Sequence, residues 1–376
     1  MDNIRSNLFK SLHKLVVKVG TKILVDNDNK PAKDQLDHLA SQLSLLHDRG
    51  YAVVLVTSGA VGVGMGALGY TTRPKELPEK QACAAIGQIS LMHLYSEAFA
   101  KRKKTVAQIL LSAEDFRDRV RFNNIRKTVG TLLSKGVIPI INENDTITTE
   151  EIKVGDNDKL SADVAHFLEA DLLIILSDED GLFTKNPKSN PDAKPISVVQ
   201  KITPEILRLA EEKPGSKVSV GGMKAKLLAI RQATEAGTPA VLTRGHNAKL
   251  LELVEGTPRG TLFLPNPDKI GRNKRWLAFV SKARGQLFLD EGGAKMMRAG
   301  KSSLLPVGIK ECKGHFKAGD FVEICSLSGD IIGRGQTAYS ASEVQVICGQ
   351  KSHRIKELLG RVGPDEVIHR DHLVIF

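Results

Sequence analysis

The stretch VIPIINENDTITTEEIKVGDNDKLSADVA, residues 137–165, contains the pattern that decides the fold. It begins with a short apolar run and passes through a polar segment to Gly155. It then continues as an amphipathic segment, LSADVAHFL, over residues 160–168. We expect a buried strand, a polar connection and a helix. This order is typical of one unit of an α/β sheet.

Other apolar runs rich in Val, Ile and Leu repeat this pattern before residue 250. They are LVVKVG (15–20), AVVLVTSG (52–59), LLIILSDEDG (172–181), PAVLTRG (239–245) and a weaker one, TVAQILLSAED (105–115). Longer amphipathic stretches lie between them, such as residues 34–50, which close on Gly50 as a helix C-cap. Strands that alternate with helices predict an open, mainly parallel sheet sandwiched by helices.

The ends of these runs predict a ligand site. Four runs end in small polar or charged residues: Thr57-Ser58-Gly59, Asn142-Glu143-Asn144-Asp145, Ser177-Asp178-Glu179-Asp180 and Thr243-Arg244-Gly245. In an open α/β sheet, ligands bind beyond the carboxyl ends of the strands. We therefore expect a ligand site at this edge of the sheet.

After about residue 260 the pattern changes. Residues 260–276 carry prolines, glycines and a basic cluster, as an interdomain linker does. Short alternating strands are then expected in GQLFLDEG (285–292), DFVEICSLSGDIIGRGQTAYS (320–340), EVQVICG (343–349) and EVIHRDHLVIF (366–376). They predict a small, mostly β barrel. The expected organisation is a first domain over 1–262, a linker over 263–276 and a second domain over 277–376.

Composition excludes several classes of protein. Of the 376 residues, 41% are hydrophobic, yet no apolar run approaches the roughly 20 residues that a membrane-spanning helix needs. The N-terminal segment MDNIRSNLFKSLHK lacks the apolar core of a signal peptide, so we expect a cytoplasmic protein without a membrane partner. The cysteines show no CxxC pairing and predict reduced thiols rather than a zinc site: Cys83, Cys312, Cys325 and Cys348.

The net charge of +11 leaves two classes of partner open. An excess of this size suits anionic small substrates as well as RNA. A basic linker with Lys269, Arg272, Lys274 and Arg275 motivates the alternative of an RNA-binding protein that acts through its tail. Against it, the tail lacks an obvious basic stripe with interleaved aromatic residues.

Two glycine-opened helix starts are compatible with a bound phosphate. The run from Gly59 to Gly66 would let backbone N–H groups approach an anion, or would serve as a tight packing turn. The second start, in residues 219–230, places Lys224 and Lys226 in its first turns, where they oppose the helix dipole unless a phosphate lies between. A surface helix with two solvated lysines is the alternative. Neither start matches the Walker or dinucleotide signature.

Two polar features of the sequence require an explanation. Lys18, inside an apolar strand, either faces an anion beyond the strand end or extends to solvent. One residue of Asp156-Asn157-Asp158 suits a helix N-cap, while the others could hold a metal-nucleotide or a substrate ammonium group. No residue is assigned to a metal site of the protein's own.

The sequence contains no arrangement typical of a general base. Ser-His-Asp, HExxH and Cys-His patterns are not discernible, and the ten histidines avoid the strand ends. If the reaction is phosphoryl transfer, the acceptor therefore needs no deprotonation, and a carboxylate fits. Catalysis would then depend on positioning and on lysine and Mg²⁺ to neutralise charge.

The motifs, taken in order, resemble those of the glutamate 5-kinases, members of the amino acid kinase family. The matching segments are VVKVGTKIL, VVLVTSGAVGVGMGALG, VIPIINENDTITTEEIKVGDNDKLSADVA, LSDEDGLFTKNP and GGMKAK. The tail is similar to the PUA domain. The resemblance implies ATP-dependent phosphorylation of the γ-carboxylate of L-glutamate, at the start of proline biosynthesis. Sibling carboxylate or carbamate kinases share the sheet and are the alternative.

The resemblance also implies roles for individual residues. Lys18 and Lys226 would contact ATP phosphates and stabilise the transferring phosphoryl group, and Asp158 would hold both lysines. The residues implied for glutamate binding are Ser58, Asp145 and Asn157. Those implied for ATP binding are Lys18, Ser177, Asp178, Val220, Gly221, Gly222, Met223, Lys224, Ala225 and Lys226. Asp156 is then left as the helix cap.

The sequence departs from the family pattern at two places, and the same resemblance implies cofactors and partners. The family loop reads TGGMxTK, whereas here Val220 and Ala225 replace both threonines and Lys224 adds a charge, so we expect activity with altered ATP affinity. Ser177 stands where threonine is common. The implied cofactors are ATP and Mg²⁺. The implied partners are a second or further copies in a homodimer or homotetramer, proline as feedback inhibitor, and a glutamyl phosphate reductase.

Overall fold

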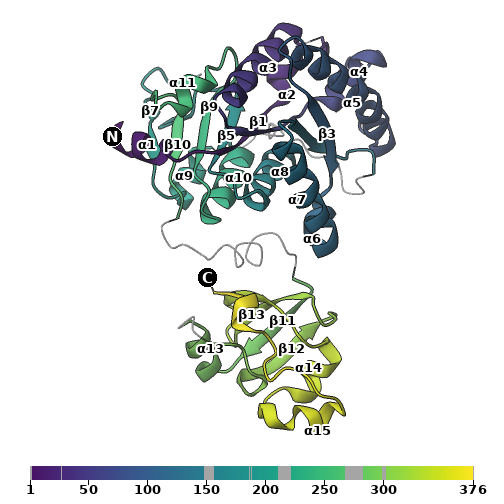
Figure 1. Ribbon diagram of the computed structural model, residues 1–376. Coiled ribbons are helices and arrows are strands. Elements are labelled where there is room, and N and C mark those ends of the chain that lie inside the picture. Colours follow the sequence, from purple (N-terminus) through teal and green to yellow (C-terminus); the bar gives the residue numbers. More distant parts are fainter. Residues whose placement is uncertain are drawn as a thin grey trace. The chain divides into compact units, whose positions relative to one another are not determined.

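The computed structural model describes residues 2–26, 28–147, 156–185, 187, 189–210, 222–266, 283–298 and 302–375. The chain forms two compact units, Met1–Pro267 and Asp268–Phe376 (Figure 1). The expected domain boundaries at 262 and 277 stay predictions. The first of them falls inside a strand, β10 (Thr261–Phe263), and the second lies outside the described residues.

The first unit is built on an eight-stranded sheet with the order β3-β4-β2-β1-β5-β9-β10-β8. The strands are β1 (Lys14–Val19), β2 (Ala52–Val56), β3 (Val106–Leu111), β4 (Ile138–Glu143), β5 (Leu172–Ser177), β8 (Val198–Val199), β9 (Ala240–Arg244) and β10 (Thr261–Phe263). All neighbours pair in parallel except β9 and β10. The prediction of an open, mainly parallel sheet is confirmed. A separate antiparallel pair joins β6 (Leu182–Phe183) to β7 (Pro195–Ile196).

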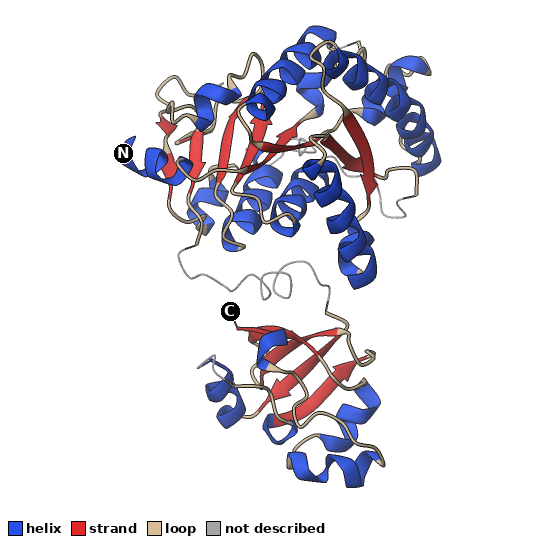
Figure 2. Ribbon diagram, viewed as in Figure 1, coloured by secondary structure: helices blue, strands red, loops and turns tan. Residues whose placement is uncertain are grey.

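Helices cover both faces of this sheet (Figure 2). They are α1 (Asp2–Phe9), α2 (Thr21–Leu24), α3 (Lys33–Asp48), α4 (Ala60–Ala67), α5 (Leu77–Ala100), α6 (Ala113–Arg117), α7 (Arg119–Ser134), α8 (Asp156–Phe167), α9 (Pro204–Arg208), α10 (Met223–Glu235) and α11 (Leu250–Val254). The helices α3 and α5 lie on one face, and α7, α8 and α10 lie on the other. Because the central strands are buried on both faces, their sequences are almost entirely apolar, with Lys18 of β1 as the notable exception.

The apolar spacing of α3 shows how sequence becomes packing. Its buried residues recur at helical intervals: Leu36, Leu39, Ala40, Leu43, Ser44 and Leu46. The helix ends before Gly50, which adopts a left-handed φ of 88° as a closing glycine does. The leucines join side chains of β1, β2 and α5 in the main core of the unit.

Helices α4 and α5 approach each other through glycines. A Cβ atom added to Gly64 would lie 1.8 Å from the carbonyl oxygen of Cys83, and one added to Gly87 would lie 1.8 Å from that of Ala60. Such distances exclude any side chain. Close packing therefore accounts for Gly64 within the glycine run, whereas Gly59 has a φ of 102° and makes the turn between β2 and α4.

A buried arginine joins the beginning of this unit to its end. The guanidinium group of Arg5, on α1, is 3% exposed. It donates hydrogen bonds to four backbone carbonyl oxygens, those of Ser197 (3.3 Å), Thr257 (3.4 Å), Arg259 (2.9 Å) and Gly260 (3.0 Å). Arg5 thereby satisfies acceptors beside β8 and β10. We call this arrangement the Arg5 clasp.

The second unit contains a five-stranded sheet with the order β12-β11-β13-β14-β15. The strands are β11 (Gly285–Leu289), β12 (Ile309–Gly314), β13 (Phe321–Ser326), β14 (Ile331–Gln336) and β15 (Leu373–Ile375). Pairing is antiparallel except between β11 and β13. Short helices accompany it: α13 (Glu291–Arg298), α14 (Ala341–Ile347), α15 (Ile355–Leu359), and 3-10 turns at Pro306–Gly308, Ser352–Arg354 and Arg370–His372. This unit has a core of its own.

One predicted strand is wrong. Residues 343–349 were expected to be extended, but Ala341–Ile347 form helix α14. Ser340 and Glu343 make a capping box, in which each side chain binds the backbone N–H of the other. The residues that α14 buries lie at helical spacing: Ala341, Val344 and Ile347. The alternating valines of EVQVICG therefore do not mark two faces of a strand.

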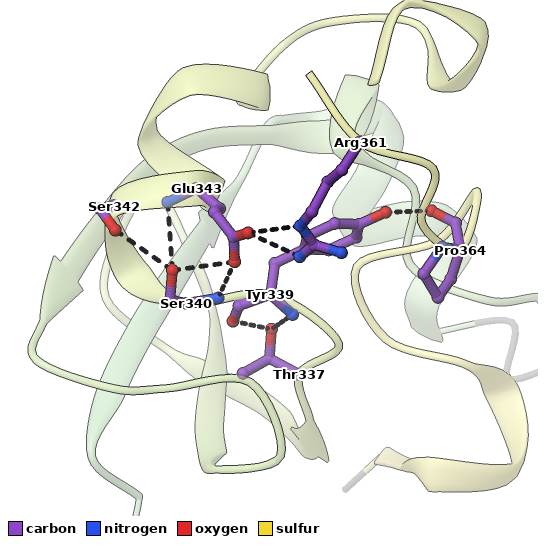
Figure 3. A network of polar contacts seen from close by, with 7 residues as sticks. All are labelled: Thr337, Tyr339, Ser340, Ser342, Glu343, Arg361 and Pro364. Carbon is purple, nitrogen blue, oxygen red and sulfur yellow. Dashed lines mark hydrogen bonds and ion pairs between the residues drawn. The ribbon is translucent and has the colours of Figure 1, made fainter. Parts of the chain in front are cut away.

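A polar network anchors α14 to the following segment (Figure 3). The guanidinium group of Arg361 forms an ion pair of 2.6 Å with Glu343 and lies 5.4 Å from the ring centre of Tyr339. The Tyr339 ring is fully buried, and its hydroxyl donates to the carbonyl oxygen of Pro364. These contacts connect the capping box to residues 361–364 on the surface of the unit.

Candidate active site

Lys18 lies in the centre of the sheet near the carboxyl end of β1. It is aligned with Val56 of β2 and Ile175 of β5. The residue is only 3% exposed, so the alternative of a lysine that reaches solvent is excluded. A buried ammonium group of this kind requires an anionic partner.

Asp158 is that partner, and it serves a second lysine as well. Lys18 Nζ lies 2.5 Å from Asp158 Oδ1, and Lys226 Nζ lies 3.4 Å from Asp158 Oδ2. Asp158 is in the first turn of α8 and Lys226 in the first turn of α10. Asp158 and Lys226 are 1% and 8% exposed. We call these three residues the lysine–aspartate cluster.

The electrostatics of the cluster favour an added anion. Burial lowers the pKa of Lys18, the neighbouring Asp158 carboxylate raises it, and the like charge of Lys226 lowers it again. The Asp158 carboxylate is thus shared by two buried ammonium groups. Preoriented positive charge in a buried site stabilises negative charge that develops during a reaction.

A second contact joins the two helices that carry the cluster. Gln232 of α10 donates a hydrogen bond to Asp163 of α8, and Lys159 lies 3.8 Å from the same carboxylate. Asp163 is buried. The contact holds α8 and α10 side by side below the cluster.

Ser58 follows β2 and is buried at the start of the turn into α4. The hydroxyl of Thr57 donates to the carbonyl oxygen of Ser58 at 3.3 Å and accepts from the hydroxyl of Tyr95 at 2.9 Å. Tyr95 is fully buried on α5, and its burial raises the pKa of the phenol. The backbone at Ser58 is therefore held from α5.

Asn157 reaches the end of the neighbouring strand, β4. The backbone N–H of Glu143 donates to Oδ1 of Asn142 at 2.9 Å and to Oδ1 of Asn157 at 3.3 Å. In turn, Nδ2 of Asn142 donates to Oε1 of Gln88 at 2.7 Å. Asp145 is half-buried two residues beyond β4. Ser58 and Asp145 thus follow the adjacent strands β2 and β4, and Asn157 of α8 contacts the end of β4.

Ser177 and Asp178 lie at the end of β5. Ser177 Oγ donates to Asp178 Oδ1 at 3.2 Å, and Lys22 of α2 forms an ion pair of 2.9 Å with Asp178 Oδ2. Sequence reasoning did not identify Lys22, because its partner is distant in the chain. It also gave no role to Gln88 or Asn142. The one available signal was a glutamine on the otherwise apolar buried face of α5.

The glycine loop before α10 is described only in part. Gly222 is the N-cap of α10 and offers no side chain to its first N–H groups. Lys224 is exposed, whereas Lys226 points into the cluster. Val220 and Gly221 lie outside the described residues, as does the side chain of Asp156. The roles predicted for these three residues, including the Asp156 cap, stay predictions.

Two kinds of feature are absent from the described residues. Among them, no group of three or more His, Cys, Asp or Glu side chains is arranged to hold a metal ion. In the same part of the chain, no helix has both the length and the apolarity that crossing a membrane requires.

Comparison with known proteins agrees with this fold. The sequence model of the amino acid kinase family matches residues 13–244, and that of the PUA domain matches residues 285–359. The chain therefore belongs to the amino acid kinase family. It is 44% identical over 373 residues to a protein of Geobacter sulfurreducens (99% of this chain, 100% of the relative) that is named Glutamate 5-kinase. A Caldanaerobacter subterraneus protein of the same name is 45% identical over 363 residues (96% and 97%). Within the family, the chain thus groups with the glutamate 5-kinases.

A solved structure shows the same fold for the first unit. The carbamate kinase of Giardia lamblia bound to AMP-PNP superposes with a TM-score of 0.50 and 20% sequence identity. The match covers 68% of this chain and 99% of that chain. At this identity the likeness concerns the fold alone.

Proposed function

We propose that this protein transfers the γ-phosphoryl group of ATP to the γ-carboxylate of L-glutamate, which yields L-glutamyl 5-phosphate for proline biosynthesis. The observation that carries the proposal is the buried lysine–aspartate cluster at the carboxyl end of the sheet. It lies on the edge where hydroxyl, amide and carboxylate groups follow β2, β4 and β5. The name of the relatives supports glutamate as the acceptor.

The cluster suits this chemistry because both reactants are anions. A carboxylate acceptor is ionised at neutral pH, so the reaction requires no general base. The barrier comes largely from bringing the carboxylate up to the negatively charged γ-phosphate. Lys18 and Lys226 would lower it by stabilising charge on the transferring group, and Asp158 would hold both ammonium groups in place.

Glutamate would bind at the ends of β2 and β4. Oδ1 of Asn157 accepts the N–H of Glu143, so its Nδ2 is the group left to donate to a substrate carboxylate. Asp145 offers a negative charge for the substrate ammonium group, and Ser58 offers a hydroxyl from the neighbouring strand. The three groups together offer one carboxylate for the ammonium group of an amino acid and two neutral hydrogen-bond donors for its carboxylates.

ATP would bind beside β5 and α10. Ser177, Asp178 and the loop from Val220 to Lys226 are the proposed contacts. Magnesium usually binds through one or two carboxylates together with substrate phosphates, and Asp178 is a strand-end carboxylate that can serve in this way. When bound, Mg²⁺ would neutralise charge on the β- and γ-phosphates. We propose that the ion enters with ATP.

Trapping the product tests the proposed reaction. Incubation with ATP, Mg²⁺, hydroxylamine and L-glutamate should give γ-glutamyl hydroxamate, whereas L-aspartate in place of glutamate should give little product. No hydroxamate with glutamate, or a preference for aspartate, would refute the proposal. The same comparison separates a glutamate kinase from sibling carboxylate kinases.

The remaining partners are part of the proposal as well. We propose a cytoplasmic homodimer or homotetramer, inhibition by proline, and delivery of the labile product to a glutamyl phosphate reductase. The alternative of an RNA-binding protein that acts through its tail is not favoured, because both relatives match the kinase unit and the tail together under the kinase name.

A further inference from the structure

Gln88 has a role in the acceptor site that neither the motifs nor the comparisons assign. We propose that Gln88 is a positioning residue of the glutamate pocket, which orients Asn157 by way of Asn142. The inference rests on the proposed function, since it concerns one of the two proposed substrates. Its physical basis is a chain of hydrogen bonds whose direction is set at one end by a backbone N–H group.

Helix α5 places Gln88 at a fixed depth against the sheet. The neighbouring Gly87 lets the backbone of α5 touch α4, because a Cβ atom there would lie 1.8 Å from the carbonyl oxygen of Ala60. Gln88 is 8% exposed and reaches Asn142 at the end of β4. About two helical turns further along the same face, Tyr95 reaches Thr57 at the end of β2. One face of α5 thus supports both strand ends that would hold glutamate.

The backbone N–H of Glu143 determines the orientation of each amide in the chain. This group can only donate, so the atoms that receive it, in Asn142 and Asn157, are the carbonyl oxygens. The amino group of Asn142 must then donate to Gln88, whose oxygen accepts it at 2.7 Å. The amide of Gln88 is thereby oriented as well, with its oxygen towards Asn142.

The same orientation leaves one polar group unsatisfied. Nε2 of Gln88 is buried and has no hydrogen-bond partner within the described part of the chain. A buried donor without an acceptor destabilises a fold, and an apolar side chain of similar length would avoid that loss. Glutamine at position 88 is therefore poorly explained by stability alone, and its oxygen is what Asn142 uses.

Removal of that oxygen should act on glutamate and not on ATP. Without an acceptor for its amino group, the Asn142 amide can rotate and withdraw its oxygen from the Glu143 N–H. The hydrogen bond from the Glu143 N–H to Asn157 Oδ1 would then change its geometry. As a result, Asn157 Nδ2 would no longer be oriented towards the substrate. In the described part of the chain, the nucleotide contacts on β5 and α10 have partners elsewhere: Ser177 binds Asp178, and Lys226 pairs with Asp158.

The test uses the full-length protein and the hydroxamate assay. Gln88→Met removes the acceptor and also the unsatisfied donor at nearly constant volume. We expect the KM for glutamate to rise about tenfold, the effect of one orienting hydrogen bond, while the KM for ATP stays unchanged. The Tm should change little, because the variant removes the unsatisfied donor of Gln88 but takes the acceptor from Asn142. Gln88→Asn, which is too short to reach Asn142, should raise the glutamate KM similarly. Gln88→Glu keeps an acceptor for Asn142, so its glutamate KM should lie between those of the wild type and Gln88→Met.

Two controls separate positioning from a structural effect. Gln42→Met removes a hydrogen bond from Leu250 N to a glutamine on α3, and it should leave the glutamate KM unchanged. In an Asn142→Ala background, Gln88→Met should raise that KM no further, because the path through Asn142 is already broken.

The outcomes distinguish the two levels of the proposal. An unchanged glutamate KM in both Gln88→Met and Gln88→Asn, or an equal rise in both KM values, overturns the role of Gln88 while the kinase function stands. A wild-type protein that forms no glutamyl hydroxamate overturns the proposed function, and the role of Gln88 with it.

Discussion

Asp158 divides one carboxylate between two buried ammonium groups, and this sharing sets the expected effect of mutating it. Asp158→Asn leaves Lys18 and Lys226 close together without the negative charge between them. We expect kcat to fall by about 100-fold or more, as when a preoriented electrostatic group is lost. The Tm should fall too, since breaking a buried ion pair costs about 3–5 kcal/mol.

Steady-state kinetics and thermal unfolding check this prediction. The KM for glutamate should change far less than kcat. Asp37→Asn serves as the control, because it removes a partly exposed carboxylate whose partners are Arg102 and Lys101, and it should leave kcat unaltered. A large rise in the glutamate KM of Asp158→Asn at normal kcat would instead assign Asp158 to substrate binding.

The lowered pKa of Lys18 gives the reaction an alkaline limit. Burial is the main cause of the shift below the ordinary 10.5, and the proposed role requires the charged form. As the pH rises through this lowered pKa, the ammonium group is lost, so kcat/KM for ATP should fall at a pH below 10.5. Lys18→Arg keeps its charge, and in it the fall should move to higher pH at a lower maximal rate.

Rates measured from about pH 6 to about pH 10 test this limit. The same shift affects stability. Because the folded-state pKa of Lys18 lies below the unfolded one, the unfolded chain binds the proton more tightly. The unfavourable contribution is therefore full below the folded pKa and disappears as the pH rises past the unfolded value. If kcat/KM for ATP falls at the same alkaline pH in Lys18→Arg as in the wild type, the fall belongs to a group other than Lys18.

Single residues differ in how far the sequence could reveal them. Lys18 was noticeable because a lysine inside an apolar strand needs an explanation. Its partners Asp158 and Lys226 came from the family resemblance, because nothing local relates residues on separate helices. Lys22 and Gln88 gave no comparable signal, since their partners, Asp178 and Asn142, are brought to them only by the fold.

The contact of α4 with α5 is the element most sensitive to an added methyl group. Gly87→Ala would place its Cβ atom 1.8 Å from the carbonyl oxygen of Ala60, so the helices must move apart. We expect a loss of about 1–3 kcal/mol or more in the free energy of unfolding. The glutamate KM should rise too, because α5 carries Gln88.

Urea unfolding with a matched glycine substitution checks this prediction. Gly130→Ala lies in α7, where an added Cβ atom meets nothing within 4 Å. It should stabilise the protein by about 0.5–1 kcal/mol through helix propensity alone. A Gly87→Ala protein as stable as the wild type would show that α4 and α5 can separate without loss.

Elements that are buried on both faces were the easiest to predict. The strands β1, β2, β4, β5 and β9 lie within mainly apolar runs, which a doubly covered sheet favours. The short segment at α14 was misread, because two alternating valines outweighed the capping box at Ser340 and Glu343. In so short a segment, the capping residues at the helix start are more informative than the spacing of the apolar residues.

At the scale of the whole molecule, the two units should be separable. The buried core of the first unit and that of the second share no residue, and every described residue of the proposed site lies before residue 227. A chain of residues 1–267 should fold and keep hydroxamate formation within about threefold of the full-length rate, since surface changes away from a core have small effects. Circular dichroism and the hydroxamate assay measure both properties.

A truncated chain that folds but has lost activity would mean that the second unit contributes to catalysis. The division into units was visible in the sequence as a change from long apolar runs to short alternating ones. The exact boundary was not visible, because Thr261–Phe263 still pair with β9 of the first unit as strand β10.

The Arg5 clasp has a consequence for how the protein is made. Arg5 leaves the ribosome well before Gly260, whose carbonyl group is synthesised 255 residues later. At about 5–20 residues per second this is a delay of roughly 10–50 seconds. Limited proteolysis of ribosome-bound chains of increasing length should show α1 protected only after residue 260 has emerged. Helix α1 can thus reach its native place only after residues 257–260 have been made, although it is translated long before them.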